Sequence, residues 1–141
     1  NMTSVNMSGP IVVLLAYVVL YYVLQGLQLR VKSRLGREYR ERGEKFDRYF
    51  NQDREMLAAD RVVLNTVEHM GPFLLLLWLM AVFVDPFRAT IGGTVYVLGR
   101  ATYPFVLGQR LGRNIPLRIV SSTFPGYGVL IWFIVELLVV L

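Results

Sequence analysis

The run Pro72–Phe83, PFLLLLWLMAVF, decides the fold, because it is an uninterrupted apolar stretch that directly follows a polar segment. Continued to Val84 it has only 13 residues, whereas a helix needs about 20 to cross a bilayer. A span of about 61–84 is long enough, and it brings Arg61, Asn65 and Glu68 within about 60° of one another on one helix face. Buried charge in a bilayer normally faces a bundle interior or a wet cavity, so this polar stripe is the leading candidate site.

Composition places the rest of the chain in the same class. Hydrophobic residues make up 55% of the sequence, and further apolar blocks lie at about 11–29, 90–110 and 123–141. The block 11–29 has 19 residues, which as a helix span about 30 Å. A signal peptide is the alternative for this block, but its apolar run is longer than a usual signal core and no small-residue cleavage site follows. We therefore predict an all-α, integral membrane four-helix bundle, formed by a single domain over residues 1–141.

Basic residues predict the orientation. Nine Lys or Arg lie between Arg30 and Arg54 and three between Arg110 and Arg118, whereas the turn near Asp85 has only Arg88. With four spans, the basic loop 30–60 and the loop near Arg110 lie on one side, which the positive-inside rule makes cytoplasmic, with both termini opposite. This topology explains the net charge of +5. No basic patch with interleaved stacking aromatics is present, so no nucleic-acid partner is predicted.

Local patterns refine this picture. Charges of alternating sign from Arg37 to Arg48 predict a solvated helix or ordered loop with pairs four residues apart, and Asp85-Pro86 predicts a sharp end to the second span. Small residues in the third span, such as Gly92 and Gly93, allow close helix packing. The sequence contains no cysteine, which excludes disulfides and catalysis by a protein thiolate, and no metal site is predicted. A chain this short seals few charged groups, so a homo-oligomer with its site between subunits is our hypothesis.

Three segments carry a family resemblance. The stretch Arg61-Val-Val-Leu-Asn65-Thr-Val-Glu68-His-Met-Gly-Pro72-Phe73, the end of the first span at Leu29-Arg30, and Gly99-Arg100-Ala-Thr-Tyr103 occur in order on a four-span topology. Together they resemble the MAPEG family, membrane-associated proteins in eicosanoid and glutathione metabolism. The resemblance covers nearly the whole chain. It implies a homotrimer that binds glutathione between subunits near the cytoplasmic side and acts, as a transferase or peroxidase, on a lipophilic electrophile or lipid hydroperoxide from the membrane.

The resemblance also assigns roles to residues. Glutathione carries two carboxylates, an ammonium and a thiol, so its site needs cations, an anion and a donor near the sulfur. The predicted cofactor-binding residues are Arg30, Arg61, Asn65, Glu68, Arg100 and Tyr103. Arg100 could pair with Glu68 across helices. Arg118 is the predicted catalytic residue, because a cation near the sulfur favours the nucleophilic thiolate; Arg113 or Arg110 could take this role instead.

Departures from the family pattern keep a second function open. Leu64, Leu107 and Ile119 stand where some members have polar residues, and their loss would remove hydrogen bonds to glutathione. The alternative function is a non-catalytic, lipid-binding or scaffold subunit of a larger membrane assembly. Separately, the polar stripe could be an interfacial helix end whose residues only pair with one another and with basic loop residues. His69 points about 100° away from the stripe and is interpreted as a packing or headgroup-level side chain. A transporter has little support, because no inverted repeat or broken helix pair is present.

Overall fold

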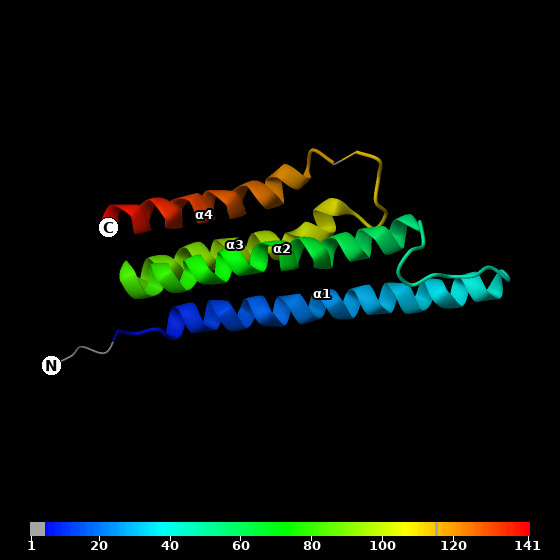
Figure 1. Cartoon of the computed structure of the whole chain (residues 1–141), viewed down its shortest axis with the longest axis horizontal. Helices are drawn as coiled ribbons and strands as arrows, with labels where there is room; N and C mark the ends of the chain where they lie inside the picture. Colours follow the sequence, from blue (N-terminus) through cyan, green and yellow to red (C-terminus); the bar gives the residue numbers. More distant parts are fainter. Residues whose placement is uncertain (1–4, 115) are drawn as a thin grey trace.

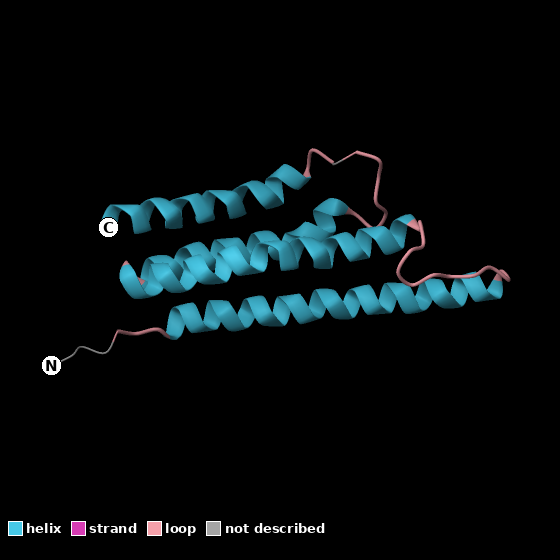
Figure 2. Cartoon of the chain, viewed as in Figure 1, coloured by secondary structure: helices cyan, strands magenta, loops and turns pink. Residues whose placement is uncertain are grey.

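The computed structural model describes residues 5–114 and 116–141, and all regular structure in this part of the chain is helical (Figure 2). Four helices, α1 (Ser8–Glu41), α2 (Arg54–Phe83), α3 (Pro86–Leu107) and α4 (Ile119–Val140), lie side by side along a common direction (Figure 1). The predicted all-α, four-helix fold is confirmed. The first two helices extend further than the predicted spans, because α1 continues to Glu41 and α2 already begins at Arg54.

Three of the helices, α1, α2 and α4, are long and apolar enough to cross a membrane. The remaining helix, α3, has 22 residues, a length of about 33 Å, but Arg88, Arg100 and its glycines lower its hydropathy. It packs against all three of the others. The crossing of α3 therefore stays a prediction, whereas the membrane character of the chain rests on the other three helices.

Local signals fix where the helices begin and end. Asp53 caps α2, its side chain accepting from the amides of Glu55 at 2.9 Å and Met56 at 3.1 Å, and Asp85 caps α3 by accepting from the amide of Arg88 at 3.0 Å. Aspartate is a favoured residue at this position, because its oxygen satisfies amides that have no partner within the helix. The sharp turn predicted at Asp85-Pro86 is thus confirmed.

The core is built from aromatic rings and close helix contacts. Phe73 of α2 stacks on Tyr96 of α3 with ring centroids 4.0 Å apart, and the fully buried Tyr17 of α1 donates from its hydroxyl to the Thr66 carbonyl at 2.9 Å. At Gly92 an added Cβ would lie 2.5 Å from the ring of Phe133 in α4. The close packing predicted for the third span is therefore present where α3 meets α4.

In the described part of the chain, three prolines lie inside helices beyond the first turn. Pro72 is in α2, Pro104 in α3 and Pro125 in α4, where the last stands beyond the first turn rather than at the helix start. Because proline has no backbone N–H, each leaves the carbonyl four residues earlier without its helical donor. These carbonyls belong to Glu68, Arg100 and Ser121.

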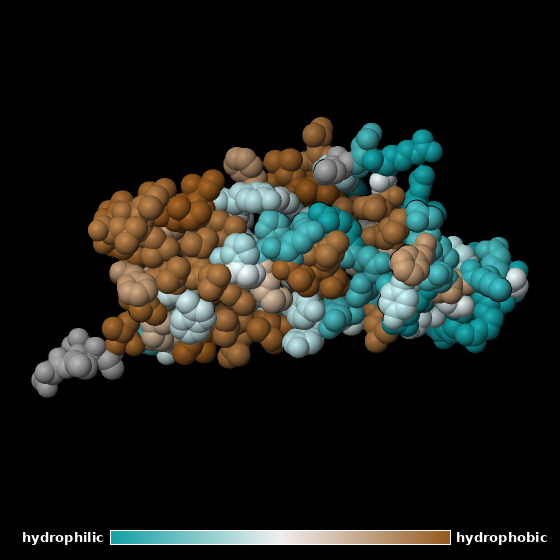
Figure 3. All heavy atoms as spheres, viewed as in Figure 1, coloured by the Kyte–Doolittle hydropathy of each residue, from teal (hydrophilic) through white to brown (hydrophobic). Residues whose placement is uncertain are grey.

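The surface is divided along the length of the bundle. Hydrophobic residues cover the part of the visible face nearest the C-terminal end of α4, and hydrophilic residues gather toward the α1–α2 loop (Figure 3). Large apolar side chains are exposed on the apolar helices, for example Val19 at 62% and Ile131 at 61%. Since exposed apolar area of this extent is normally covered in a folded protein, this surface fits a lipid environment.

Candidate functional site

The orientation of α2 in the bundle buries one residue of the polar stripe and exposes the other two. Asn65 is turned inward and is 8% exposed, whereas the side chains of Arg61 and Glu68 are 41% and 47% exposed. Arg61 Nη1 lies 3.4 Å from Glu68 Oε1 in an ion pair along the outer face of α2. The stripe thus presents one buried amide to the bundle interior and one ion pair to its surface.

Arg100 lies inside the bundle and binds Asn65. It is 3% exposed, and its Nη1 donates to Asn65 Oδ1. Within the described residues it forms no ion pair, so the predicted pairing of Arg100 with Glu68 is wrong. The reason is the rotation of α2, which points Asn65 toward α3 and turns Glu68, about 60° further round, to the outside. Because a guanidinium only donates, the amide oxygen must face it, which leaves Asn65 Nδ2 as a donor for another group.

Tyr103 lies three residues after Arg100, on the same face of α3. Its ring centroid lies 5.1 Å from Arg100 Cζ, and Tyr96 stands on the other side with its centroid at 6.0 Å. Tyr103 is 4% exposed and packs in a cluster with Leu24 and Val62. It therefore contacts Arg100 from within the bundle and does not reach the Arg61–Glu68 pair on the surface.

A narrow crevice borders Arg100 between α2, α3 and α4. It is lined by His69, Tyr96, Arg100, Thr123, Gly126, Tyr127 and Leu130. Among the described residues, the Tyr96 hydroxyl and Thr123 Oγ1 are buried without a hydrogen-bond partner. With the side chains in these positions the space is too narrow for a water molecule. His69 stands edge-on to Tyr127 with ring centroids 5.5 Å apart, in agreement with its interpretation as a packing residue.

The other predicted arginines lie at the loop end of the bundle. Arg118 directly precedes α4 and donates from Nε to the Val106 carbonyl at 2.7 Å, and Arg30 is exposed on α1. Within the described chain, neither forms a hydrogen bond or ion pair with the polar stripe. Arg110 and Arg113 are also exposed. One chain therefore brings together Arg61 with Glu68 and Asn65 with Arg100, and the roles of Arg30 and Arg118 stay predictions.

Sequence reasoning missed a polar network where α1 leaves the predicted span. Lys32 Nζ lies 2.8 Å from Asp60 Oδ1, and Gln28 Nε2 donates to the same oxygen at 2.7 Å. Lys32, only 8% exposed, also donates to the Arg48 carbonyl at 2.9 Å. The spacing of Gln28 and Lys32, four residues apart on one helix face, was the available signal.

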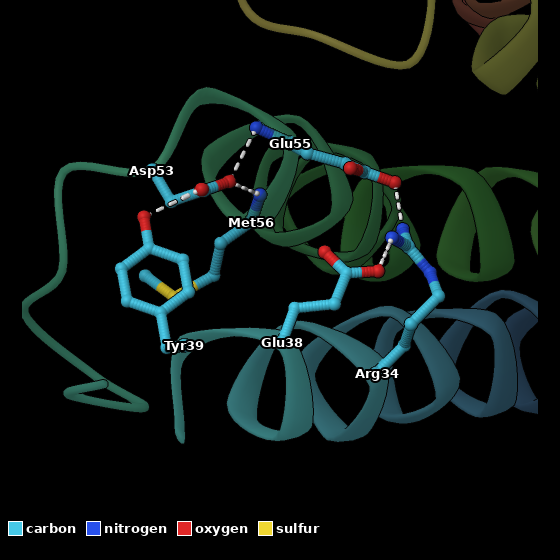
Figure 4. Close-up of polar contacts among 6 residues, drawn as sticks. All are labelled: Arg34, Glu38, Tyr39, Asp53, Glu55 and Met56. Atoms are coloured by element: carbon cyan, nitrogen blue, oxygen red, sulfur yellow. Dashed lines mark hydrogen bonds and ion pairs between the residues drawn. The ribbon is translucent and has the colours of Figure 1, made fainter. Parts of the chain in front are cut away.

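Further along α1, a second set of contacts joins the helix to the start of α2. Arg34 lies between Glu38 and Glu55, and the Tyr39 hydroxyl donates to Asp53 Oδ2 at 2.8 Å (Figure 4). Partial burial opposes ionisation of Asp53, but the hydrogen bonds from Tyr39 and from the two capped amides outweigh it and lower the pKa of this carboxyl group. Asp53 therefore acts as a charged cap at the start of α2.

Comparison with known proteins identifies the family to which the chain belongs. One relative, "Uncharacterized protein sll1147" from Synechocystis sp., is 45% identical over 53 residues, which cover 38% of this chain and 37% of the relative. The aligned segment thus spans well under two thirds of either protein. No solved structure matches the chain. The MAPEG family, in contrast, matches residues 10–139, nearly the whole chain, and the protein is therefore a member of the MAPEG family.

Proposed function

We propose that this protein is a glutathione-dependent membrane transferase or peroxidase that acts on lipophilic electrophiles or lipid hydroperoxides. Membership in the MAPEG family supports a role in glutathione-related or eicosanoid metabolism in general. Glutathione would supply the nucleophilic thiolate. The residues of this chain would bind its charged groups and hold them at the membrane surface.

The observation that carries the proposal is the exposed Arg61–Glu68 pair on a helix apolar enough to span the membrane. Charged groups in a span are costly when they face lipid, so this pair needs a cover. A second subunit together with a charged ligand would provide one. This reasoning favours a homo-oligomer, and the family resemblance favours a trimer, with the site at the subunit interface.

The chemistry of the side chains fits glutathione. The Arg61 guanidinium can bind a carboxylate through two parallel hydrogen bonds, and the Glu68 carboxylate can accept from the ammonium group. Asn65, held by Arg100 through its oxygen, offers Nδ2 as a donor to a ligand carbonyl or carboxylate. Arg118 is the proposed cation near the sulfur, where its charge would lower the pKa of the ligand thiol and raise the thiolate fraction.

Calorimetric titration with glutathione tests the proposal, using the purified protein in lipid nanodiscs. We expect saturable binding that is weakened by Glu68→Gln and by Arg118→Ala, each by about 10- to 100-fold, the range expected for a hydrogen bond to a charged group. Arg37→Ala is the matched control, because Arg37 is exposed on α1 beyond the predicted span. Absence of binding at millimolar glutathione would refute the proposal.

A non-catalytic lipid-binding or scaffold subunit is the second candidate function. It is favoured by Leu64, which is 52% exposed beside the polar stripe, and by Leu107, which is 4% exposed and packs inward. Neither position offers a hydrogen bond to a ligand. If glutathione does not bind but the protein is recovered as a stable oligomer or with a second membrane protein, this candidate replaces the enzyme.

A further inference from the structure

The loop between α1 and α2, residues 42–53, exposes two large aromatic side chains. Tyr49 is 75% exposed and Phe50 is 80% exposed. Asp47 fixes the turn that presents them, because its Oδ1 accepts from the amide of Tyr49 at 2.9 Å and from that of Phe50 at 3.0 Å. These hydrogen bonds lower the pKa of the Asp47 carboxyl group, which remains ionised at neutral pH. The two rings are thus held outward by an ordered turn.

The loop folds back along α1 toward the predicted span. The helix continues for 12 residues beyond Leu29, to Glu41, which is about 18 Å past the end of the predicted span. The chain then runs back beside the last turns of α1 before α2 begins (Figure 1). Lys32 holds it there, since its Nζ donates to the Arg48 carbonyl at 2.9 Å and lies 5.7 Å from the Tyr49 ring centroid.

The contact of Lys32 with the loop determines how far Tyr49 and Phe50 lie from the end of the predicted span. Lys32 is three residues beyond Leu29, or about 4.5 Å along the helix axis, so Tyr49 lies close to the level where the apolar span ends. Aromatic side chains are enriched at that level of membrane proteins, where amphipathic rings meet the lipid headgroups. A solvated loop gives no physical reason to expose two adjacent rings, whereas a headgroup layer does.

The charge at this end of the molecule indicates the kind of lipid. Residues 30–54 carry nine Lys or Arg against five Asp or Glu, and residues 110–118 carry three arginines and no acidic residue. Basic segments next to a span are attracted to anionic headgroups within a Debye length of the surface. Arg48 stands directly before the aromatic pair and is itself exposed.

We propose that Tyr49 and Phe50 anchor the α1–α2 loop in the headgroup layer of an anionic lipid surface, with the surrounding arginines binding the lipid phosphates or carboxylates. The anchor fixes the loop at the membrane surface next to the loop end of the bundle. It requires neither glutathione nor an active site, so it stands independently of the proposed enzymatic function.

The absence of cysteine makes a direct test possible, because a single introduced cysteine can carry a nitroxide label. Gln52→Cys is suitable, since Gln52 is exposed beside the aromatic pair. Electron paramagnetic resonance then compares collisions of the label with oxygen, which concentrates in lipid, and with a water-soluble nickel chelate. The measurement uses nanodiscs of phosphatidylcholine with or without phosphatidylserine. Glu41→Cys, at the far end of α1, is the matched control and should report water throughout.

We expect the label at position 52 to report the headgroup layer, more deeply with phosphatidylserine, and to move into water when Tyr49→Ser and Phe50→Ser are combined. A position 52 label as accessible to the nickel chelate as the control would overturn the proposal, as would a depth that the double substitution leaves unchanged. Equal depth in both lipid mixtures would overturn the requirement for anionic lipid. Low access to both reagents would mean that a protein partner covers the loop instead.

Discussion

Replacing Arg100 and Asn65 separately and together tests the contact at the centre of the site. Asn65→Leu leaves the 3%-exposed guanidinium of Arg100 without a protein partner within the described chain, and an uncompensated buried charge costs about 3–5 kcal/mol. Arg100→Met leaves only the neutral Asn65 oxygen without its donor, which costs about 1–3 kcal/mol. The double variant removes both groups, so it should be more stable than Asn65→Leu alone.

The free energy of unfolding can be measured for the four proteins in mixed micelles by titration with a denaturing detergent. Thr66→Val is the matched control, because the Thr66 hydroxyl donates to the Val62 carbonyl within its own helix at 2.9 Å; removing it should change stability by about 0.6 kcal/mol, the average for neutral hydrogen bonds in a membrane protein. If Arg100→Met costs more than Asn65→Leu, or if the two losses simply add, the reasoning that an unpaired charge dominates this contact is refuted.

Two further predictions concern packing and pH. Gly92→Ala should destabilise the protein by about 1–3 kcal/mol, because the added methyl group overpacks against Phe133. Gly128→Ala is the control and should leave stability unchanged, because a Cβ there meets nothing within 4 Å. Thermal unfolding of both variants measures the difference. The lowered pKa of Asp53 stabilises the fold above the unfolded pKa of about 3.9, and this stability is lost as the pH falls through the folded pKa. Asparagine still caps a helix but does not titrate, so Asp53→Asn should remove this loss of stability at acid pH. Unfolding curves recorded at pH values through the folded and unfolded pKa of Asp53 measure it, and a variant with the same pH dependence of stability as the wild type would contradict the prediction.

The helices were predictable because their signals are local. Apolar runs of bilayer length, an aspartate before proline at residue 85 and alternating charges after residue 37 all depend on neighbours along the chain. The pairs four residues apart that were predicted for residues 37–48 are not observed among the described residues, where Arg42 pairs with Glu44 instead, and such a pair is found just before this stretch, between Arg34 and Glu38 at 2.8 Å. The helix ends were less predictable. The start of α2 at Arg54 depends on the cap at Asp53 and on its contact with Tyr39 from another helix, which hydropathy does not record.

The site was predictable as a stripe but not as a set of contacts. Helical spacing places Arg61, Asn65 and Glu68 on one face, yet it cannot tell which edge of that face meets α3. The rotation of α2 about its axis depends on contacts between residues far apart in the sequence, including the stacking of Phe73 on Tyr96. Because of this rotation, Arg100 forms its hydrogen bond with Asn65 and not with Glu68. Arg30 and Arg118 form no hydrogen bond or ion pair with the stripe within the described chain, so their predicted roles in binding glutathione stay predictions.

The three interior prolines have a mechanical consequence. The carbonyls they leave without helical donors belong to Glu68, Arg100 and Ser121, on three different helices, and each lies within or next to the layer that contains the polar stripe and the crevice beside Arg100. Helices bend most easily where such a hydrogen bond is missing. We therefore expect the three helices to bend first in this polar layer. Because Tyr96 and Leu130 line the crevice and also belong to the buried core, a bend of α4 there would change the crevice and the core contacts together.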